Sequence, residues 1–123
     1  MATITNRIMN FKGVVRNDAF SFSFVLLTNI DLTGKKFIMQ VRLSAMDKLW
    51  LEFKESDNTL RVGPVTAIDS RKTQRTIGFY MDANKMTLPS NIYKYGLSAY
   101  SDTTDKINLI KGVFQVVDEI PKI

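Results

Sequence analysis

The sequence predicts an all-β sandwich, because strand-like patterns and turn signals follow one another along its 123 residues. Apolar residues alternate with polar ones at a period of two, which is typical of strands with one buried face. Turn-forming residues interrupt these segments about every 8 to 12 positions, a spacing typical of sandwiches rather than of βαβ units. We therefore expect roughly seven or eight antiparallel strands and one short helical turn before Pro89.

Residues 16–42 show the clearest alternation and predict a hairpin, in which two strands of one sheet are joined by a short polar turn that contains Asp31, Thr33 and Gly34. Serines separate the aromatic residues of the first strand, and Lys36 and Gln40 alternate with apolar residues in the second. The apolar positions of these strands and of two later strands form the predicted core, which consists of Phe20, Phe22, Phe24, Leu26, Phe37, Met39, Val41, Phe79 and Tyr93.

The rest of the chain supplies further strands and one helical turn. Asp82 is a candidate N-cap for a turn that Pro89 ends, and the polar residues 63–75 predict a loop. In the segment 49–53, Leu49 and Leu51 share one face with the phenylalanine that follows. The predicted strands are 49–53, Leu60–Val62, 76–81, 92–100 and Ile107–Val117, of which the last two form a terminal hairpin.

One domain is expected at this length, with the sandwich over residues 16–118 and a short C-terminal tail at 119–123. Residues 1–15 contain apolar positions without a clean period and predict either an N-terminal arm or an edge strand. The first residues lack the apolar core of a signal peptide, and no apolar run is long enough to span a bilayer. We therefore expect a soluble protein that does not contact a membrane.

Histidine and cysteine are absent from the sequence, which removes the usual acid–base group at neutral pH, thiolate nucleophiles and the common zinc ligands. No histidine is present to activate a serine, and no glycine-rich phosphate loop occurs. The acidic pairs Glu52/Glu55 and Asp102/Asp105 lack the spacing of a calcium loop and predict turn residues. We expect no enzyme activity, no cofactor, and no catalytic or metal site.

Tyr93 follows a corner proline, Pro89, by four residues near the start of a late strand. This spacing matches the tyrosine corner of Greek-key sandwiches, in which the hydroxyl bonds back to the main chain. The alternative is that Tyr93 is an ordinary aromatic residue of a half-buried strand. The corner interpretation favours an immunoglobulin-like sandwich.

A series of short motifs runs through the chain from an Arg-x-Asp at residues 16–18 onward. They are IDLTG at 30–34, FIMQVR at 37–42, LWLEF at 49–53, YKY at 93–95 and LIKGVF at 109–114. In this order they resemble the immunoglobulin-like domain found at the N-terminus of siphophage baseplate upper proteins, over most of the chain after residue 15. The chain departs from that pattern at Asn17, where a glycine is usual, and in its longer and more basic loop at 63–75.

The resemblance implies a bacteriophage virion structural protein, a multi-copy adaptor in the tail, baseplate or fibre-attachment region that acts through protein–protein contacts. Its partners would be other virion proteins and copies of itself, and its location would be the virion, assembled in the host bacterial cytoplasm. One alternative is a capsid decoration or head-fibre protein. Another is a carbohydrate-binding module that contacts the host surface through exposed aromatics such as Trp50, Tyr80 and Tyr100.

The N-terminal segment holds the first candidate interface residues. Ile4, Ile8, Met9 and Phe11 are apolar enough to require burial, either against a neighbouring subunit or in the domain's own sheet. Trp50 has the opposite parity to the apolar residues beside it, so it either faces outward at an interface or, in a shifted register, fills the core.

The densest positive run is a second candidate interface. Arg71, Lys72 and Arg75 lie in the predicted loop and either meet an acidic neighbour or form a solvated loop. The formal charge of +5 favours acidic partners, although the cations are scattered along the chain. The run contains no aromatic residues that could stack on bases, so we do not expect a nucleic-acid-binding site here.

Overall fold

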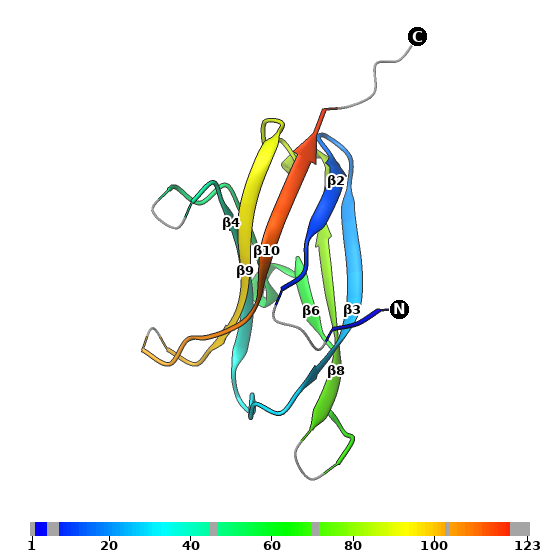
Figure 1. The fold of residues 1–123 in the computed structure, drawn as a ribbon, viewed down its shortest axis with the longest axis vertical. Helices are drawn as coiled ribbons and strands as arrows, with labels where there is room; N and C mark the ends of the chain where they lie inside the picture. Colours follow the sequence, from blue (N-terminus) through cyan, green and yellow to red (C-terminus); the bar gives the residue numbers. More distant parts are fainter. Residues whose placement is uncertain (1, 5–7, 45–46, 70–71, 103, 119–123) are drawn as a thin grey trace.

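The computed structural model describes residues 2–4, 8–44, 47–69, 72–102 and 104–118, which form an all-β fold (Figure 1). Over these residues the strands are β1 (Ala2–Ile4), β2 (Phe11–Val15), β3 (Phe20–Thr28), β4 (Lys36–Arg42), β5 (Leu51–Lys54), β6 (Leu60–Val62), β7 (Thr66–Ala67), β8 (Thr73–Met81), β9 (Asn91–Tyr100) and β10 (Ile107–Val117). Two short 3₁₀ helices, η1 (Glu55–Asp57) and η2 (Ala83–Lys85), complete the described elements. No helix in this part of the chain is long and apolar enough to cross a membrane.

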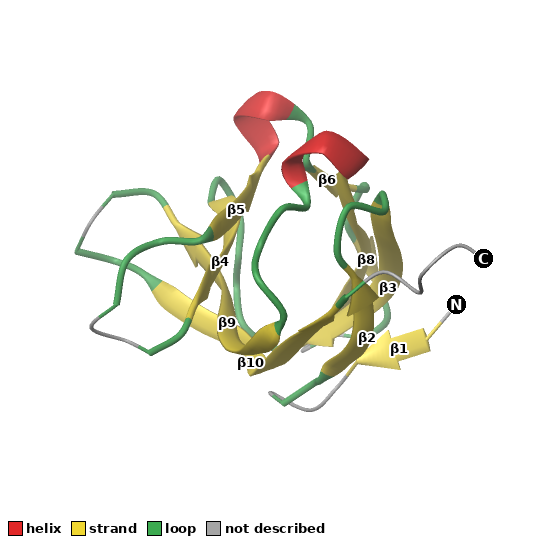
Figure 2. Ribbon diagram, turned by 90° about the horizontal axis from the view of Figure 1, so that it is seen from above, coloured by secondary structure: helices red, strands yellow, loops and turns green. Residues whose placement is uncertain are grey.

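Strand pairing divides the molecule into two sheets that lie in separate layers (Figure 2). Sheet 1 has the order β1-β3-β8-β6, and the short β7 pairs with the beginning of β8. Sheet 2 has the order β2-β10-β9-β4-β5. The buried apolar side chains come from both sheets and fill the space between them, which confirms the predicted sandwich.

Two strand pairs are parallel, so the expectation of antiparallel strands alone is wrong. β1 runs parallel to β3, with Ala2 opposite Phe24, and β2 runs parallel to β10, with Phe11 opposite Phe114. A long stretch of chain separates each N-terminal strand from its partner, so no tight turn imposes an antiparallel direction. Residues 1–15 thus contribute two edge strands to the sandwich, and β2 extends its core beyond the predicted boundary at residue 16.

Residues 16–42 do not form the predicted hairpin, because β3 and β4 lie in different sheets. The polar turn at 29–35 carries the chain from one layer to the other. In this turn, Asp31 Oδ1 accepts a hydrogen bond from the main-chain N of Thr33 at 3.0 Å, and Leu32 is buried. Each strand has one apolar face, and placing the strands in opposite sheets lets these two faces pack against each other.

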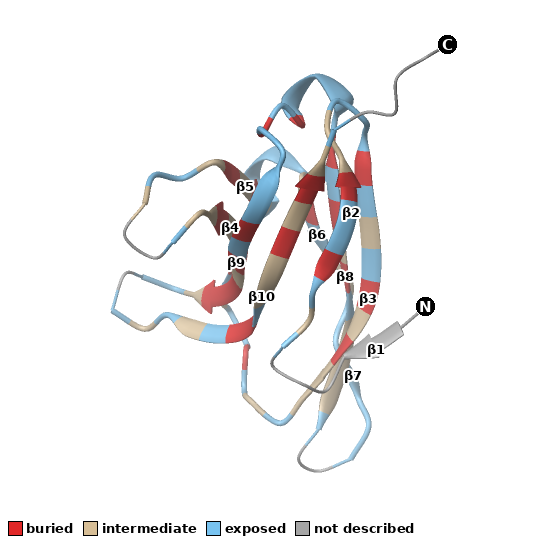
Figure 3. Ribbon diagram, turned by 45° about the horizontal axis from the view of Figure 1, so that its top comes forward, coloured by how far each residue is buried: buried red, intermediate tan, exposed pale blue. Residues whose placement is uncertain are grey.

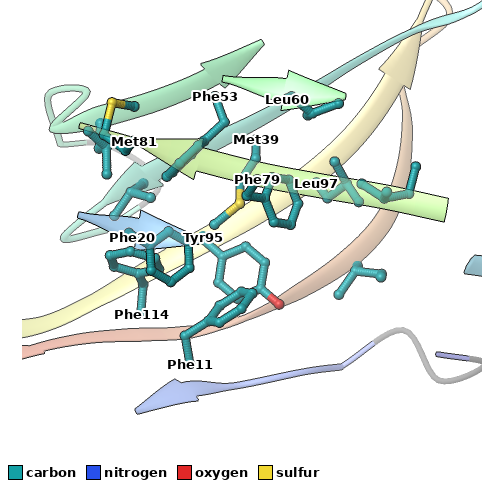
Figure 4. Close-up of a cluster of buried hydrophobic side chains, with 14 of the residues drawn as sticks. Phe11, Phe20, Met39, Phe53, Leu60, Phe79, Met81, Tyr95, Leu97 and Phe114 are labelled. Carbon is teal, nitrogen blue, oxygen red and sulfur yellow. The ribbon is translucent and has the colours of Figure 1, made fainter. Parts of the chain in front are cut away.

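The core consists of the inward-facing residues of both sheets. Figure 4 shows the rings of Phe11, Phe20, Tyr95 and Phe114 close together within it. Burying each large apolar side chain stabilises the fold by about 1.5–3 kcal/mol. Among the predicted core residues the buried ones are Phe20, Phe24, Leu26, Phe37, Met39, Val41, Phe79 and Tyr93, whereas Phe22 is only half-buried.

The predicted loop at residues 63–75 is partly a hairpin. Thr66 lies opposite Gln74, and Ala67 lies opposite Thr73, so β8 begins three residues before the predicted start at Thr76. Both residues of β7 are exposed. A strand that buries neither face shows no apolar alternation, and the pattern that marks the other strands is therefore missing here. The predicted helical turn before Pro89 is present as η2.

The tyrosine corner is present. Tyr93 Oη donates a hydrogen bond to the main-chain O of Pro89 at 2.7 Å, and the residue is 1% exposed. Burial raises the pKa of the Tyr93 hydroxyl above its ordinary value, so it stays protonated and keeps donating at neutral pH. The corner ties the start of β9 to the segment that enters it.

Tyr93→Phe should lower the free energy of unfolding by about 0.5–1.5 kcal/mol, because the buried Tyr93 side chain loses its hydrogen bond to Pro89 O. Urea denaturation of the purified chain measures this loss. Tyr100→Phe is the matched control, since the Tyr100 hydroxyl has no hydrogen bond to the described residues and its removal should cost under about 0.5 kcal/mol. Equal losses in the two variants would show that the corner bond contributes nothing specific.

Candidate functional site

The N-terminal segment packs on the domain's own sheets. Ile4 lies opposite Leu26 in the pairing of β1 with β3. Ile8 forms an isolated parallel bridge with Lys111 and remains 62% exposed, whereas Met9 is partly buried against the core.

Phe11, a candidate interface residue, is a core residue with 7% exposure, so of the two alternatives the structure shows burial in the domain's own sheet and not at an interface. The pairing of β2 with β10 turns its ring into the space between the sheets. Among Ile8, Met9 and Phe11, whose burial the structure describes, Ile8 is the one with an exposed side chain.

In addition to the pairing of β2 with β10, three hydrogen bonds attach Met9 and Asn10 of the N-terminal segment to sheet 2. Met9 N donates to Lys111 O at 3.0 Å, and Tyr95 Oη donates to Met9 O at 2.6 Å. In the third, the main-chain N of Val113 donates to Asn10 Oδ1 at 3.0 Å. Burial raises the pKa of the Tyr95 hydroxyl well above its ordinary value, so this group remains a donor throughout the neutral range.

Gly112 makes the close approach of this segment to β10 possible. A Cβ atom at this position would lie 1.9 Å from Met9 O and 2.8 Å from Asn10 Oδ1. The first of these contacts is with a main-chain atom, which cannot move aside as the end of a flexible side chain can. Any residue other than glycine at this position would therefore push the N-terminal segment away from sheet 2.

A groove lies between β2 and β3, and we call it the β2–β3 seam. Within the described residues, β2 pairs only with β10, and residues 20–23 of β3 pair only with β8, because β1 covers β3 only at 24–26. The groove has a volume of about 430 Å³, and its lining includes Ala19 and Phe22. Phe22 lies edge-to-face with Phe11, with 5.0 Å between ring centroids. The opening of the sandwich at the seam is the reason why Phe22 is only half-buried.

The seam has the features of a site for strand addition. The free sides of β2 and of residues 20–23 carry main-chain N–H and C=O groups without strand partners among the described residues. Such edges pair with extended segments of other chains when nothing covers them. Phe22 adds an apolar contact for one side chain of such a segment.

Trp50 is half-buried, between the two predicted alternatives of core and interface. Its indole lies edge-to-face with Tyr93, with 5.7 Å between ring centroids, and packs against the core. Its Nε1 donates to Asp47 Oδ2 at 3.3 Å, and Lys48 Nζ lies 3.9 Å from the ring centroid. Leu49, expected on the buried face with Leu51, is 39% exposed, because β5 begins only at Leu51.

The predicted positive run is divided between different environments. Arg71 lies outside the described residues, and Lys72 is exposed in the turn before β8. Arg75 belongs to β8 rather than to a solvated loop, and its guanidinium lies 5.3 Å from the centroid of the Phe37 ring. Partial burial lowers the pKa of Arg75 from its ordinary value. The described part of the run is therefore split between an exposed turn residue, Lys72, and a partly buried strand residue, Arg75.

The acidic pairs serve as turn and strand contacts. Glu55 Oε2 accepts a hydrogen bond from the main-chain N of Phe37 at 2.8 Å. Asp105 accepts from Lys35 Nζ at 2.8 Å and from the main-chain N of Ser101 at 2.8 Å, and it accepts from the Ser101 hydroxyl as well. The Lys35 ammonium, followed by the Ser101 hydroxyl, holds the pKa of the Asp105 carboxyl well below its usual range. No group of three or more acidic side chains in the described residues is placed to hold a metal ion.

The three aromatic residues considered for sugar binding do not share a face. Trp50 packs on Tyr93 just before β5, and Tyr100 is the last residue of β9 in sheet 2. Tyr80 belongs to sheet 1, where it is 47% exposed opposite Ser21. The dispersal of these rings provides no common platform for a sugar chain.

Gly112→Ala should release the N-terminal segment, because the added methyl group cannot coexist with Met9 O in the observed packing. We expect a fall of about 2–4 kcal/mol in the free energy of unfolding, together with faster amide hydrogen exchange at residues 8–15. Gly96→Ala is the control, since a Cβ at Gly96 would meet nothing within 4 Å. Unchanged exchange at residues 8–15 in Gly112→Ala would contradict the proposed attachment.

No protein-family model and no curated protein matches this chain. Among solved structures, the chain is similar to a family 123 glycoside hydrolase from Clostridium perfringens, with 9% sequence identity and a TM-score of 0.45. The match covers 95% of this chain and 24% of the hydrolase chain. At this TM-score, the similarity carries no argument about function.

Proposed function

We propose that this chain is a bacteriophage virion structural protein, a multi-copy adaptor in the tail, baseplate or fibre-attachment region. It acts by binding other virion proteins and copies of itself, without catalytic turnover. The observation that carries this proposal is the β2–β3 seam, where two strands next to a half-buried phenylalanine lack partners on one side. An adaptor requires such a surface for joining neighbouring chains.

The strand order supports the immunoglobulin-like resemblance from which the proposal starts. Immunoglobulin sandwiches place strands A, B, E and D in one sheet and C, F and G in the other. Equating β3, β8 and β6 with B, E and D, and β4, β9 and β10 with C, F and G, reproduces these neighbours. Tyr93 then lies near the start of strand F, the usual place of the tyrosine corner. The parallel pairings of β1 and β2 are departures from the antiparallel immunoglobulin pattern.

The seam favours an extended segment of a neighbouring chain as the bound partner. Main-chain hydrogen bonds to a free strand edge supply affinity, while a pocket for alternate side chains supplies specificity. Repeated copies in a particle add avidity, so that each contact can be modest and the assembly still stable.

Mass spectrometry of purified particles of the phage that encodes this sequence should detect the chain as a multi-copy component. Electron-microscopy density should place it in the tail, baseplate or fibre-attachment region. Density on the capsid would favour the decoration alternative over the proposed location. Absence from purified particles would contradict a virion role altogether.

Ala19→Arg should reduce incorporation of the chain into particles, because a long charged side chain on an exposed residue of the seam blocks an incoming segment. Ala83→Arg is the matched control, since Ala83 is also exposed, lies in η2 and is not among the residues that line the seam. Both variants should keep the thermal unfolding midpoint of the unmodified chain. Equal incorporation of the two variants, measured by quantitative mass spectrometry, would remove the seam from the assembly contact.

A further inference from the structure

The outer face of sheet 2 carries a groove of about 290 Å³ over Gly96, which we call the Gly96 groove. Its lining includes the cations Arg42, Lys94 and Lys106 and the polar residue Asn108, and none of the described residues that line it is acidic. We propose that this groove binds an extended acidic segment of a partner protein. The inference deepens the proposed function, on which it rests for the kind of partner.

Strand register brings like charges together in this groove. Arg42 lies directly opposite Lys94 in the pairing of β4 with β9. Lys111, which is outside the groove lining, lies opposite Gly96 on the neighbouring strand β10. Like charges at directly opposed positions of a sheet destabilise it. In the described residues, neither Arg42 nor Lys94 has a carboxylate partner, and Arg42 Nη1 donates only to the uncharged main-chain O of Asp47, at 2.8 Å. A bound anion would relieve this repulsion.

Gly96 forms an open floor for the groove. It faces outward from the middle of β9, and a Cβ built there would meet no atom within 4 Å. The segments that follow β4 and β9 project from the same side of the molecule (Figures 1 and 3). They place Ser44 and Lys106 at the rim of the groove. The groove is therefore bounded by two projecting segments and has no side chain at its centre.

The groove fits an elongated ligand better than a single small anion. At about 3.3 Å per strand residue, Lys94 and Ser98 are about 13 Å apart along β9, and Lys106 lies beyond Ser98. One phosphate or carboxylate cannot contact cations at both ends. An extended peptide places alternate side chains on one side at about 7 Å intervals, so two or three carboxylates would match this spacing.

The lining favours a polypeptide over a nucleic acid. Asn108 is exposed in the lining and accepts a hydrogen bond from the buried Ser98 Oγ at 3.1 Å, and an amide side chain can pair with both N–H and C=O groups of a peptide. The aromatic ring in the lining belongs to Tyr95, which is 4% exposed and bonded to Met9 O. A buried ring cannot stack on a base, and stacking is the main source of affinity for single strands besides charge.

The test measures binding of a fluorescein-labelled oligoglutamate peptide to the purified full chain by fluorescence anisotropy at low salt. Lys94→Ala and Gly96→Leu should each weaken binding by about five- to tenfold, the first by removing a cation and the second by filling the floor without changing charge. Arg61→Ala removes an exposed cation of β6 in sheet 1, away from the groove lining, and should change affinity by less than about twofold. Circular dichroism checks that each variant is folded.

Three results would overturn the inference. The first is no binding of oligoglutamate at low salt. The second is equal weakening by Arg61→Ala and Lys94→Ala with no effect of Gly96→Leu. The third is tighter binding of oligothymidylate than of oligoglutamate. The peptide-binding test and the virion role can fail separately. If the chain is found in particles but does not bind oligoglutamate, only the inference about the Gly96 groove is contradicted. If the chain binds oligoglutamate as expected but is absent from particles, only the proposed adaptor function is contradicted.

Discussion

The contact on which the rest of the structure depends is the packing of the Phe11 ring among aromatic rings from both sheets. The distances between its centroid and theirs range from 5.0 to 6.4 Å, and the partners are Phe20, Phe22 and Phe79 of sheet 1 and Tyr95 and Phe114 of sheet 2. Each aromatic pair of this kind contributes about 0.5–1.5 kcal/mol beyond the burial of its area. Because Phe11 belongs to β2, one side chain both joins the two layers and forms the inner wall of the β2–β3 seam.

Much of the strand pattern could be predicted from the sequence, whereas the pairing of strands could not. Leu60–Val62 and Ile107–Val117 begin and end where their alternation indicates, since one face of each is apolar and turn residues bound it. Alternation identifies the buried face of a strand but not its neighbour. For this reason the sequence predicts β3 and β4 in one sheet, although they lie in different sheets. The strand β7 was not predicted, because both of its residues are exposed and it shows no alternation.

The same distinction applies to the candidate sites. The Tyr93 corner could be predicted because its signal is a local spacing from Pro89. The burial of Phe11 and the stacking of Arg75 on Phe37 could not, since both depend on residues far away in the sequence. The cations of the Gly96 groove are separated along the chain and meet only through strand register. Gly96 lies in the interior of the predicted strand 92–100, and a glycine at such a position indicates that a ligand or another chain can approach the sheet closely.

The position of β10 has a consequence for biosynthesis. This strand lies between β2 and β9 in sheet 2, although it is the last described strand in chain order. During translation, β2 has no sheet 2 partner until residues 107–117 have left the ribosome. The nascent chain therefore emerges with an unpaired apolar N-terminal strand, which is the condition under which chaperones bind and premature association occurs. Sheet 2 can close only after β10 has been synthesised, and this closing step joins segments about a hundred residues apart, a separation that slows folding.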